Sequence, residues 1–501
     1  MLHVKGLTNT VAAQPLPQVA ARAPRRGRVA AVAPRILLLT SGLGCGHVRA
    51  AEAIEHALLR TAPGATVRQL DFWTLMNPGV AATIQKKYLE LVLENPALYA
   101  RLHRLDERTW RRVIENDIPP PAEVIESIEL LTRNGDPERR TMASLFEWAL
   151  GPYPTDLIFF PTACAALPTS SSGRAGNNVA LLRLALLKWA FLRLQGRMEQ
   201  RLLEFEPDAI VATQMVPAAL VSAIKQGSGR WRGVPLLGVL TDFGAHDYWA
   251  QPGIDRYCVP HDSVAGPPLV PPGDADPGRL VTTGVPLMPS FESLPDRATA
   301  RLAIGLDPAD TRPVVLVLGG GLGIGLDDIV LPLARDLAQC HVVVMAGRND
   351  DVREGLRRHC GGLTREAAGA GATVRIEGWT EHMERYLVAA DVVVGKSGGL
   401  TVAEVLACGR PLLVTRTLQG QESFNVRFLE RHGIGRLVAN VELAPQVREW
   451  LASPGLLQEI QERAWAAGRR DGAVRVAEET LRLAAARTTR QAARVADRGL
   501  R

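Results

Sequence analysis

The sequence predicts an α/β protein with two domains, each built on a parallel β-sheet. Short apolar runs, such as Arg35 to Thr40 and the three valines after Asp391, are followed by glycine-containing turns and then by helical periodicity. The chain has 501 residues, which is long for one ordinary domain. Prolines and glycines crowd residues 260–290, between these two regions. We expect a disordered basic arm over 1–34, a first domain over 35–288, a second domain over 289–470 and a basic helix over 471–501.

The positive charge of the chain is concentrated at its two ends. Residues 1–35 hold six basic residues and no acidic residue, and residues 482–501 hold six arginines against one aspartate. Basic ends of this kind favour contact with an anionic membrane surface, and solvated tails are the alternative. Because no aromatic residues are interleaved with these charges, we expect no nucleic-acid partner.

Cysteine usage and hydropathy favour a reducing compartment and no membrane span. The six cysteines are scattered, with no C-x-x-C pair, which favours free thiols and no zinc site. No apolar run reaches the roughly 18 residues that a transmembrane helix needs, and residues 1–34 lack the apolar core of a secretory signal. We expect a cytoplasmic protein that binds peripherally to the inner face of the cell membrane.

The first expected strand, Arg35 to Thr40, leads through a glycine-rich turn into a helix whose apolar spacing runs from Ala50 to Leu59. His47 stands at the start of that helix. The helix dipole lowers the pKa of an imidazole there, which favours a neutral ring that can accept a proton. A purely structural histidine is the alternative. A dinucleotide-binding fingerprint is disfavoured, because its last glycine would fall at position 47.

Two further strands are expected in the first domain, at 207–212 and 234–240. The second of them leads into Asp242 and His246. Titratable side chains at the carboxyl end of a parallel strand favour a place in a ligand site, with strand-end capping as the alternative. Residues 107–172 contain proline-rich and serine-rich loop signals and are assigned no chemistry.

The second domain is expected to begin with strands at 313–318 and 341–345. Gly347, Arg348 and Asn349 follow the second of these strands. Arg348 can supply positive charge to phosphate groups at the carboxyl end of the sheet. A plain surface arginine is the alternative.

The most informative stretch is 391–433. A buried valine strand is followed by Gly398 and Gly399, and the next residues are expected to form a helix. Thr401 and Glu404 have the spacing of a capping box at its start. A helix N-terminus preceded by two glycines offers bare backbone N–H groups and the positive end of a dipole, which suits a diphosphate. A P-loop is disfavoured, because its first glycine would replace the alanine at position 390.

This stretch resembles the donor-binding half of GT-B glycosyltransferases. The branch concerned contains the monogalactosyldiacylglycerol synthases, the processive diacylglycerol glucosyltransferases and the peptidoglycan enzyme that adds GlcNAc to lipid I. The family pattern K-x-G-G-x-T-x-x-E begins here at Lys396, and G-Q-E-x-x-N begins at Gly420. The glycine turn before His47 and the run 241–257 are similar to the acceptor-side motifs of the same family. The chain departs from the family at Ser397, which leaves the transferred sugar open.

The resemblance implies the GT-B fold, in which two Rossmann-like domains with parallel sheets face a central cleft. It implies an inverting enzyme that moves a hexose from a UDP-sugar, its donor substrate, to a lipid acceptor, for which diacylglycerol is expected. No separate cofactor and no metal are implied. His47 would deprotonate the acceptor hydroxyl, with Asp242 and His246 completing the catalytic set.

The resemblance also implies a set of donor-binding residues around the UDP-sugar. Glu404 would bind the ribose hydroxyls, and Gln421 and Glu422 the sugar hydroxyls. The full set is Gly347, Arg348, Asn349, Lys396, Ser397, Gly398, Gly399, Thr401, Glu404, Gly420, Gln421, Glu422 and Asn425.

Three alternative functions remain open at this point. A UDP-GlcNAc transferase acting on another lipid or on a natural product would share these motifs. A UDP-GlcNAc 2-epimerase shares the fold and needs no acceptor. A non-catalytic regulator that binds a sugar nucleotide is the alternative outside the enzymes, and the presence of His47, Gln421 and Glu422 argues against it.

Overall fold

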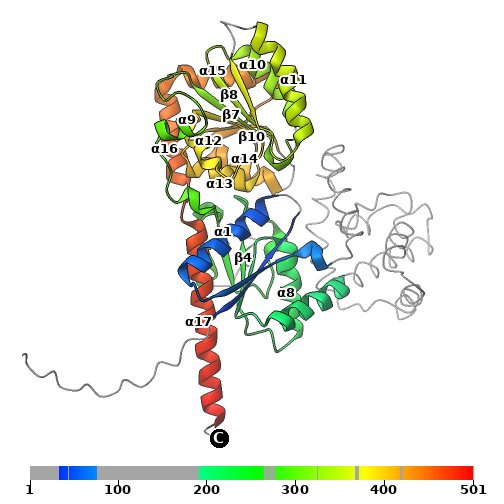
Figure 1. Cartoon of the computed structure of the whole chain (residues 1–501). Helices are drawn as coiled ribbons and strands as arrows, with labels where there is room; N and C mark the ends of the chain where they lie inside the picture. The colour runs from blue at the N-terminus through cyan, green and yellow to red at the C-terminus, as the bar shows by residue number, and fades with distance from the viewer. Residues whose placement is uncertain are drawn as a thin grey trace, which may run out of the picture. The chain divides into compact units, whose positions relative to one another are not determined.

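The computed structural model describes residues 33–42, 45–75, 191–264, 269, 277–323, 325–366, 372–417 and 421–499 (Figure 1). The expected arm over 1–34 lies almost wholly outside this part of the chain, as do residues 107–172 and Gly420. The residues from Pro34 to Arg501 form one unit that contains two separate β-sheets.

The first sheet has six parallel strands in the order β2-β1-β3-β4-β5-β6. The strands are β1 Arg35–Thr40, β2 Thr66–Asp71, β3 Ala209–Ala212, β4 Leu236–Val239, β5 Arg256–Val259 and β6 Leu280–Thr282. The α-helices of this part are α1 Cys45–Thr61, the helical residues 191–205, α8 Met215–Gly227 and, from the end of the chain, α17 Gly472–Gly499. Short 3-10 helices are η1 Phe72–Leu75, η3 Asp247–Trp249, η4 Asp262–Val264 and η5 Pro277–Arg279.

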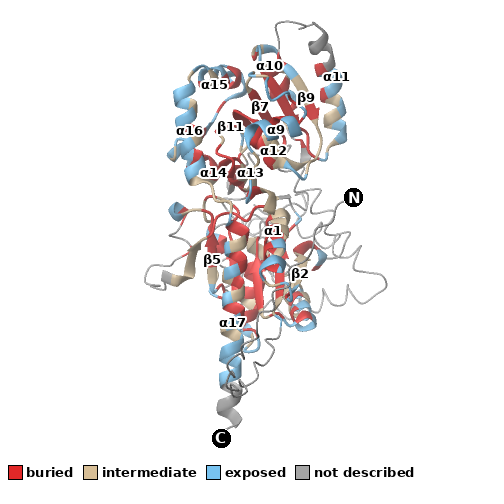
Figure 2. Cartoon of the chain, turned by 60° about the vertical axis from the view of Figure 1, so that its left-hand side comes forward, coloured by how far each residue is buried: buried red, intermediate tan, exposed pale blue. Residues whose placement is uncertain are grey.

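Helices cover both faces of this sheet because successive side chains of each strand point to opposite faces. Ile36 and Leu38 of β1 lie in an apolar core with α1 and α17. Leu37 and Leu39 lie in a second core with α8 and the helical residues 191–205. The inner strands β1, β3, β4 and β5 are accordingly buried, as Figure 2 shows for β5, whereas the edge strands β2 and β6 are partly exposed. Figure 1 shows α17 beside α1.

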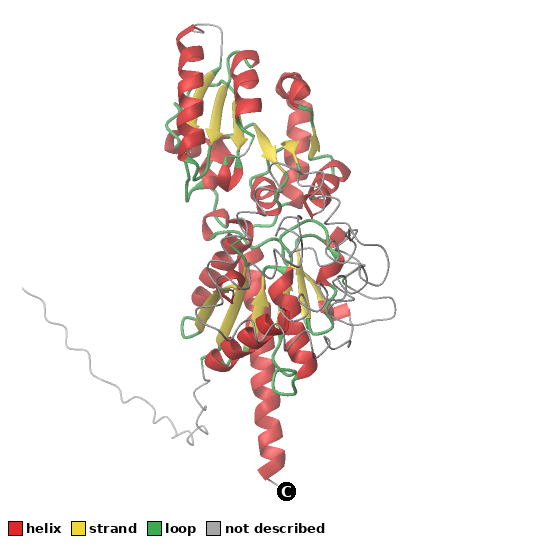
Figure 3. Ribbon diagram, turned by 90° about the vertical axis from the view of Figure 1, so that its right-hand side faces the viewer, coloured by secondary structure: helices red, strands yellow, loops and turns green. Residues whose placement is uncertain are grey.

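The second sheet also has six parallel strands, in the order β12-β11-β10-β7-β8-β9. The strands are β7 Val314–Leu318, β8 His341–Met345, β9 Thr373–Glu377, β10 Val392–Lys396, β11 Leu412–Arg416 and β12 Gly435–Leu437. The α-helices are α9 Arg297–Ala303, α10 Asp327–Asp336, α11 Asp350–Glu366, α12 Met383–Ala389, α13 Gly399–Ala407, α14 Gln421–Arg431, α15 Asn440–Ala452 and α16 Pro454–Ala467, with 3-10 helices η6 Pro289–Phe291 and η7 Gly320–Leu322. Figure 3 shows the strands flanked by helices.

The predicted strands of both sheets are confirmed, and the predicted capping box is wrong. β1 and β8 have the predicted bounds, β3 and β7 begin two residues and one residue later than predicted, and β4 is shorter than predicted at both ends. The helix α13 begins at Gly399, so Thr401 and Glu404 lie inside it and Gly398 is the N-cap residue, which has no side chain to cap with. The valine strand β10 also continues through Gly395 and Lys396.

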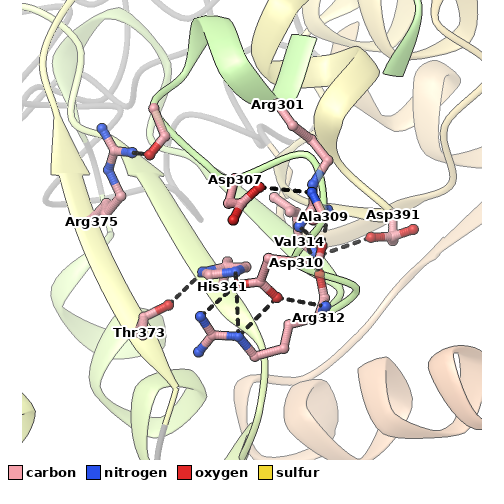
Figure 4. Close-up of polar contacts among 11 residues, drawn as sticks. Arg301, Asp307, Ala309, Asp310, Arg312, Val314, His341, Thr373, Arg375 and Asp391 are labelled. Atoms are coloured by element: carbon pink, nitrogen blue, oxygen red, sulfur yellow. Dashed lines mark hydrogen bonds and ion pairs between the residues drawn. The ribbon is translucent and has the colours of Figure 1, made fainter. Parts of the chain in front are cut away.

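Polar side chains fix the amino ends of the second sheet's strands (Figure 4). His341, the first residue of β8, contacts Asp310 through Nε2 at 2.9 Å and Thr373 of β9 through Nδ1 at 2.6 Å. Asp391, before β10, accepts a hydrogen bond from the backbone N–H of Val314 at 2.8 Å. These contacts join β7, β8, β9 and β10 at one end, which leaves the carboxyl ends of the strands to the loops of the candidate site.

The C-terminal helix α17 is 28 residues long and packs beside α1. Arg487, one of the arginines of the expected basic helix, donates to Asp208 Oδ1 at 2.8 Å and therefore faces the first domain. Of the helices that the structure describes, none is long and apolar enough to cross a membrane.

Candidate active site

The first turn of α1 holds His47 next to the carboxyl ends of β3 and β4. His47 Nδ1 lies 2.8 Å from the backbone oxygen of Thr213 and 3.3 Å from Thr241 Oγ1. Because a carbonyl oxygen can only accept a hydrogen bond, Nδ1 carries the hydrogen in the bond to Thr213. The neutral ring then has an unprotonated Nε2, which is the form that a general base requires.

The surroundings of His47 favour this neutral form. Burial lowers the pKa of His47, while the charge of Asp242 and the hydrogen bond to Thr213 act in the opposite direction. The direction agrees with the prediction, but burial is its main cause, whereas the prediction rested on the helix dipole. His47 is therefore neutral at pH 7.

Asn425 of α14 joins the loops of the two sheets. Its side chain is fully buried, and its Nδ2 donates to Asp242 Oδ1 and to the backbone oxygen of Ser397, both at 2.8 Å. Its Oδ1 accepts from the backbone N–H of Phe243 at 2.7 Å. The amide of Asn425 thus connects the loop after β4 to the turn after β10, and its predicted role in donor binding stays a prediction.

The start of α13 lies against the same loop of the first domain. A Cβ atom at Gly399 would overlap the backbone oxygen of Thr241 and would lie 2.6 Å from Asp242 Oδ1. A Cβ atom at Gly46 would lie 3.7 Å from the Cβ of Leu400. The first turns of α1 and α13 are therefore neighbours, and this brings the predicted base close to the predicted diphosphate site.

The N-terminus of α13 can receive an anion. Because the cap residue is Gly398, no side chain of this residue satisfies the first backbone N–H groups of the helix. A Cβ atom at Gly398 would lie 3.4 Å from Lys396 Nζ and 3.5 Å from Glu422 Oε1. A cation therefore stands beside this helix end, as a bound diphosphate would require.

Lys396 and Glu422 form an ion pair at this helix end, with Nζ and Oε1 3.1 Å apart. Glu422 is buried, and its backbone oxygen accepts from Ser397 Oγ at 3.4 Å. Gln421 begins α14, but its side chain lies outside the part of the structure that is described. The structure thus brings together Lys396, Ser397 and Glu422 of the predicted donor set.

Glu404 lies one turn further along α13, and its carboxyl group is held in the neutral form. Burial raises the pKa of Glu404 to about 8, the charge of Arg49 lowers it, and the charge of Glu384 raises it. A neutral carboxyl at pH 7 can both donate and accept a hydrogen bond, which suits a pair of vicinal hydroxyls such as those of a ribose.

This raised pKa predicts that Glu404→Gln changes how stability depends on pH. The unfolded chain loses the Glu404 proton near 4.5, whereas the folded protein keeps it up to about pH 8. The group therefore contributes stability that is complete below pH 4.5 and is lost as the pH rises to 8. Because glutamine does not titrate, we expect the free energy of unfolding of the variant to gain about 1–3 kcal/mol relative to the wild type between pH 5 and pH 8. Urea denaturation at both pH values measures this, and parallel pH profiles would contradict it.

The loop after β8 packs on the glycine turn after β7. Gly347 has a φ of +66°, and a Cβ atom there would lie 2.7 Å from the backbone oxygen of Gly321. Arg348 donates its backbone N–H to the same oxygen at 3.0 Å and holds its guanidinium 4.1 Å from the ring centre of Trp379. Asn349 Oδ1 accepts a backbone N–H of α11 at 3.1 Å. The predicted G-R-N motif thus forms a turn at the carboxyl end of the second sheet.

His246 has a local role in the structure. Its side chain is buried, and Nδ1 accepts the backbone N–H of Tyr248 at 3.1 Å, which caps the short helix η3. The observed contact is therefore a helix cap, whereas the alternative to a catalytic role named a cap at the strand end. Its predicted catalytic role stays a prediction.

Two residues of the site were not among those predicted. Thr213 contributes through its backbone oxygen, so its side-chain type carries no signal, and only its place after an expected strand could have marked it. Arg49, two residues after His47, forms an ion pair with Glu381 of the second domain at 2.9 Å. The sequence signal that could have identified Arg49 was its position, since it is a basic residue two positions after the predicted base His47.

Two segments of the chain match known families. Residues 180–286 match the model of monogalactosyldiacylglycerol (MGDG) synthase, and residues 314–462 match the glycosyltransferase family 28 C-terminal domain. The processive diacylglycerol beta-glucosyltransferase of Bacillus subtilis is 28% identical over 261 residues, which cover 52% of this chain and 64% of that protein. Monogalactosyldiacylglycerol synthase 3 of Arabidopsis thaliana is 27% identical over 266 residues, which cover 51% and 54%. The chain thus spans between about half and two thirds of the length of these relatives.

The fold is also similar to a solved structure. MurG of Acinetobacter baumannii superposes with a TM-score of 0.53 at 16% sequence identity, over 90% of this chain and 99% of that one. At this identity the likeness concerns the fold, and it confirms the predicted two-domain α/β architecture. The chain therefore has the GT-B fold of two parallel sheets, and it contains a segment that matches the monogalactosyldiacylglycerol synthase model and a glycosyltransferase family 28 C-terminal domain.

Proposed function

We propose that the protein is an inverting glycosyltransferase that moves a hexose from a UDP-sugar to a lipid hydroxyl, with diacylglycerol as the acceptor. The observation that carries this proposal is the neutral His47, whose Nδ1 is fixed by Thr213, beside the uncapped start of α13. The two named relatives are a diacylglycerol glucosyltransferase and a monogalactosyldiacylglycerol synthase, which supports the choice of acceptor.

In the proposed reaction, His47 Nε2 takes the proton of the acceptor hydroxyl as its oxygen attacks the anomeric carbon. The attack comes from the face opposite to UDP, so the new carbon–oxygen bond forms as the bond to the diphosphate breaks and the configuration inverts. The negative charge that develops on UDP is stabilised by the N–H groups at the start of α13 and by Lys396. Glu404 binds the ribose, and Glu422 and Gln421 bind the sugar.

We also propose that the protein acts at a membrane surface, because its acceptor resides there. The basic residues of the C-terminal helix support this, although Arg487 is engaged by Asp208 and is not free to bind lipid. Anionic lipid would attract exposed arginines such as Arg490, each worth about 1 kcal/mol near the surface.

To test this function, the protein is incubated with diacylglycerol in anionic vesicles and with one radiolabelled donor at a time, which is UDP-galactose, UDP-glucose or UDP-GlcNAc. We expect one donor to give a labelled glycolipid on chromatography of the lipid extract. The same incubation in neutral vesicles tests the membrane proposal, which predicts slower transfer. Incubation with donor alone tests the epimerase alternative. If all three UDP-sugars fail to bind, the proposed function is wrong.

A further inference from the structure

Arg49 joins the helix that carries His47 to the second domain. Its Nη1 lies 2.9 Å from Glu52 Oε2 on α1, and its Nη2 lies 2.9 Å from Glu381 Oε2 in the loop after β9. Its guanidinium carbon lies 5.9 Å from the ring centre of Trp379 in the same loop. Only 19% of the Arg49 side chain is exposed, whereas 58% of the Glu381 side chain is, so it is the guanidinium end of this ion pair that is shielded from water.

The loop that Arg49 contacts is itself tied to the predicted donor site. Trp379 Nε1 donates to Glu381 Oε1 at 2.8 Å. The guanidinium carbon of Arg348 also lies over the ring of Trp379, 4.1 Å from the ring centre. The hydrogen bond from Trp379 is the largest cause that lowers the pKa of Glu381, and the charges of Arg49 and Arg348 act in the same direction. Glu381 is therefore an ionised partner for Arg49 at neutral pH.

Arg49 also influences Glu404, the predicted ribose ligand. Its charge opposes the rise in the pKa of Glu404 that burial causes. Arg49 is thus linked to two residues of the predicted donor set, to Arg348 through the ring of Trp379 and to Glu404 through its charge.

We propose that Arg49 is a positioning residue, which couples the donor-binding domain to the catalytic base by holding the first turn of α1 against the Trp379–Glu381 loop. This inference rests on the proposed function of the same site. His47 and Arg49 are two residues apart, so a shift of the loop moves the base with it. A misplacement of about 1 Å can cost two orders of magnitude in rate, and the coupling therefore acts on turnover more than on binding of the nucleotide.

Arginine is suited to this role in a way that lysine is not. Its planar group offers separate nitrogens to Glu52 and to Glu381 while one face lies over Trp379. Lysine has a single nitrogen and cannot hold both carboxylates in this geometry. Arg49→Lys should therefore restore the charge but only part of the positioning.

The chain offers a matched control on the same helix. Arg60, at the far end of α1, forms an ion pair of 2.6 Å with Glu292, and 48% of its side chain is exposed. It also links α1 to a residue beyond the first sheet, but far along the helix from His47. Arg60→Gln tests whether any ion pair of α1 affects turnover.

The test compares Arg49→Gln, Arg49→Lys, Arg49→Glu, Arg60→Gln and the exchanged pair, in which Arg49→Glu is combined with Glu381→Arg. Transfer kinetics give kcat and KM, and calorimetry with UDP gives the dissociation constant. For Arg49→Gln we expect kcat to fall about tenfold or more, with the UDP dissociation constant within about threefold of the wild type. We expect an intermediate kcat for lysine, wild-type kcat for Arg60→Gln, and a higher kcat for the exchanged pair than for Arg49→Glu alone.

Three outcomes would overturn the inference while leaving the proposed function intact. One is that Arg49→Gln and Arg60→Gln have the same kcat, and a second is that the exchanged pair has no higher kcat than Arg49→Glu. A loss of UDP binding equal to the loss of kcat would also overturn it, because Arg49 would then be a ligand residue. Failure of the wild-type protein to bind UDP would instead refute the proposed function itself.

Discussion

Replacement of His47 by alanine is expected to lower kcat by about 10²- to 10⁴-fold, while the affinity for UDP stays within about threefold of the wild type. The imidazole is held by the backbone oxygen of Thr213, which leaves Nε2 as the proton acceptor. The groups predicted to bind UDP come from the second domain, so removal of this ring does not disturb them. Transfer kinetics and calorimetry with UDP measure the two quantities on the same preparation.

The pH dependence of the wild-type enzyme gives an independent test of the same base. The neutral form of His47 is the active one, so kcat/KM falls as the pH drops through the pKa of this group. Because burial lowers that pKa, the acidic limb is expected below pH 6.5, the ordinary value for histidine. A limb at or above 6.5 would show that another group titrates.

His246→Ala serves as the control for both experiments. The Nδ1 of His246 accepts the backbone N–H of Tyr248, so its loss removes a cap and lowers stability by about 1 kcal/mol. The kcat of this variant should exceed that of His47→Ala by at least an order of magnitude. If the two variants lose kcat equally, His246 belongs to the catalytic set after all, and if His47→Ala turns over normally, His47 does not.

Local patterns in the sequence were sufficient to predict β1, β3 and β4 of the first sheet and β7, β8 and β10 of the second. β1 and β8 are short runs of apolar residues with a clear end, and buried parallel strands need little else to be recognised. The position of His47 at a helix start followed from the same pattern, because a strand, a glycine turn and a helix appear in that order. The order of these local elements was therefore enough to predict the position of His47 in the fold.

Contacts between distant parts of the chain could not be predicted in this way. The hydrogen bond between His47 and Thr213 joins residues 166 positions apart and uses a backbone oxygen, so no pattern of side chains in the sequence predicts it. The capping box failed for a related reason. Thr401 and Glu404 had the right spacing, but the helix begins at Gly399, where the packing of Thr241 favours a residue without a side chain.

Gly399→Ala is expected to lower kcat/KM by about 100-fold or more. A Cβ atom at this position would overlap the backbone oxygen of Thr241 and crowd the carboxylate of Asp242, so α13 and the loop after β4 must move apart. That movement breaks the bond between Asn425 and Asp242, and through Thr241 it shifts the surroundings of His47. Displacements of about 1 Å at a reacting centre can have this effect on rate. Overpacking of a buried contact also costs about 1–3 kcal/mol of stability, which urea denaturation measures.

Gly455→Ala is the matched control for this substitution. Gly455 lies in α16, and nothing lies within 4 Å of the place where its Cβ atom would stand. Because Gly455 is only the second residue of α16, alanine there should change stability by no more than about 0.5 kcal/mol and leave kcat/KM unchanged. The comparison decides why position 399 holds glycine. If Gly399→Ala loses UDP affinity but keeps its stability, the glycine serves the approach of the diphosphate alone. If stability and kcat/KM fall together, contact between the two domains requires glycine at this position.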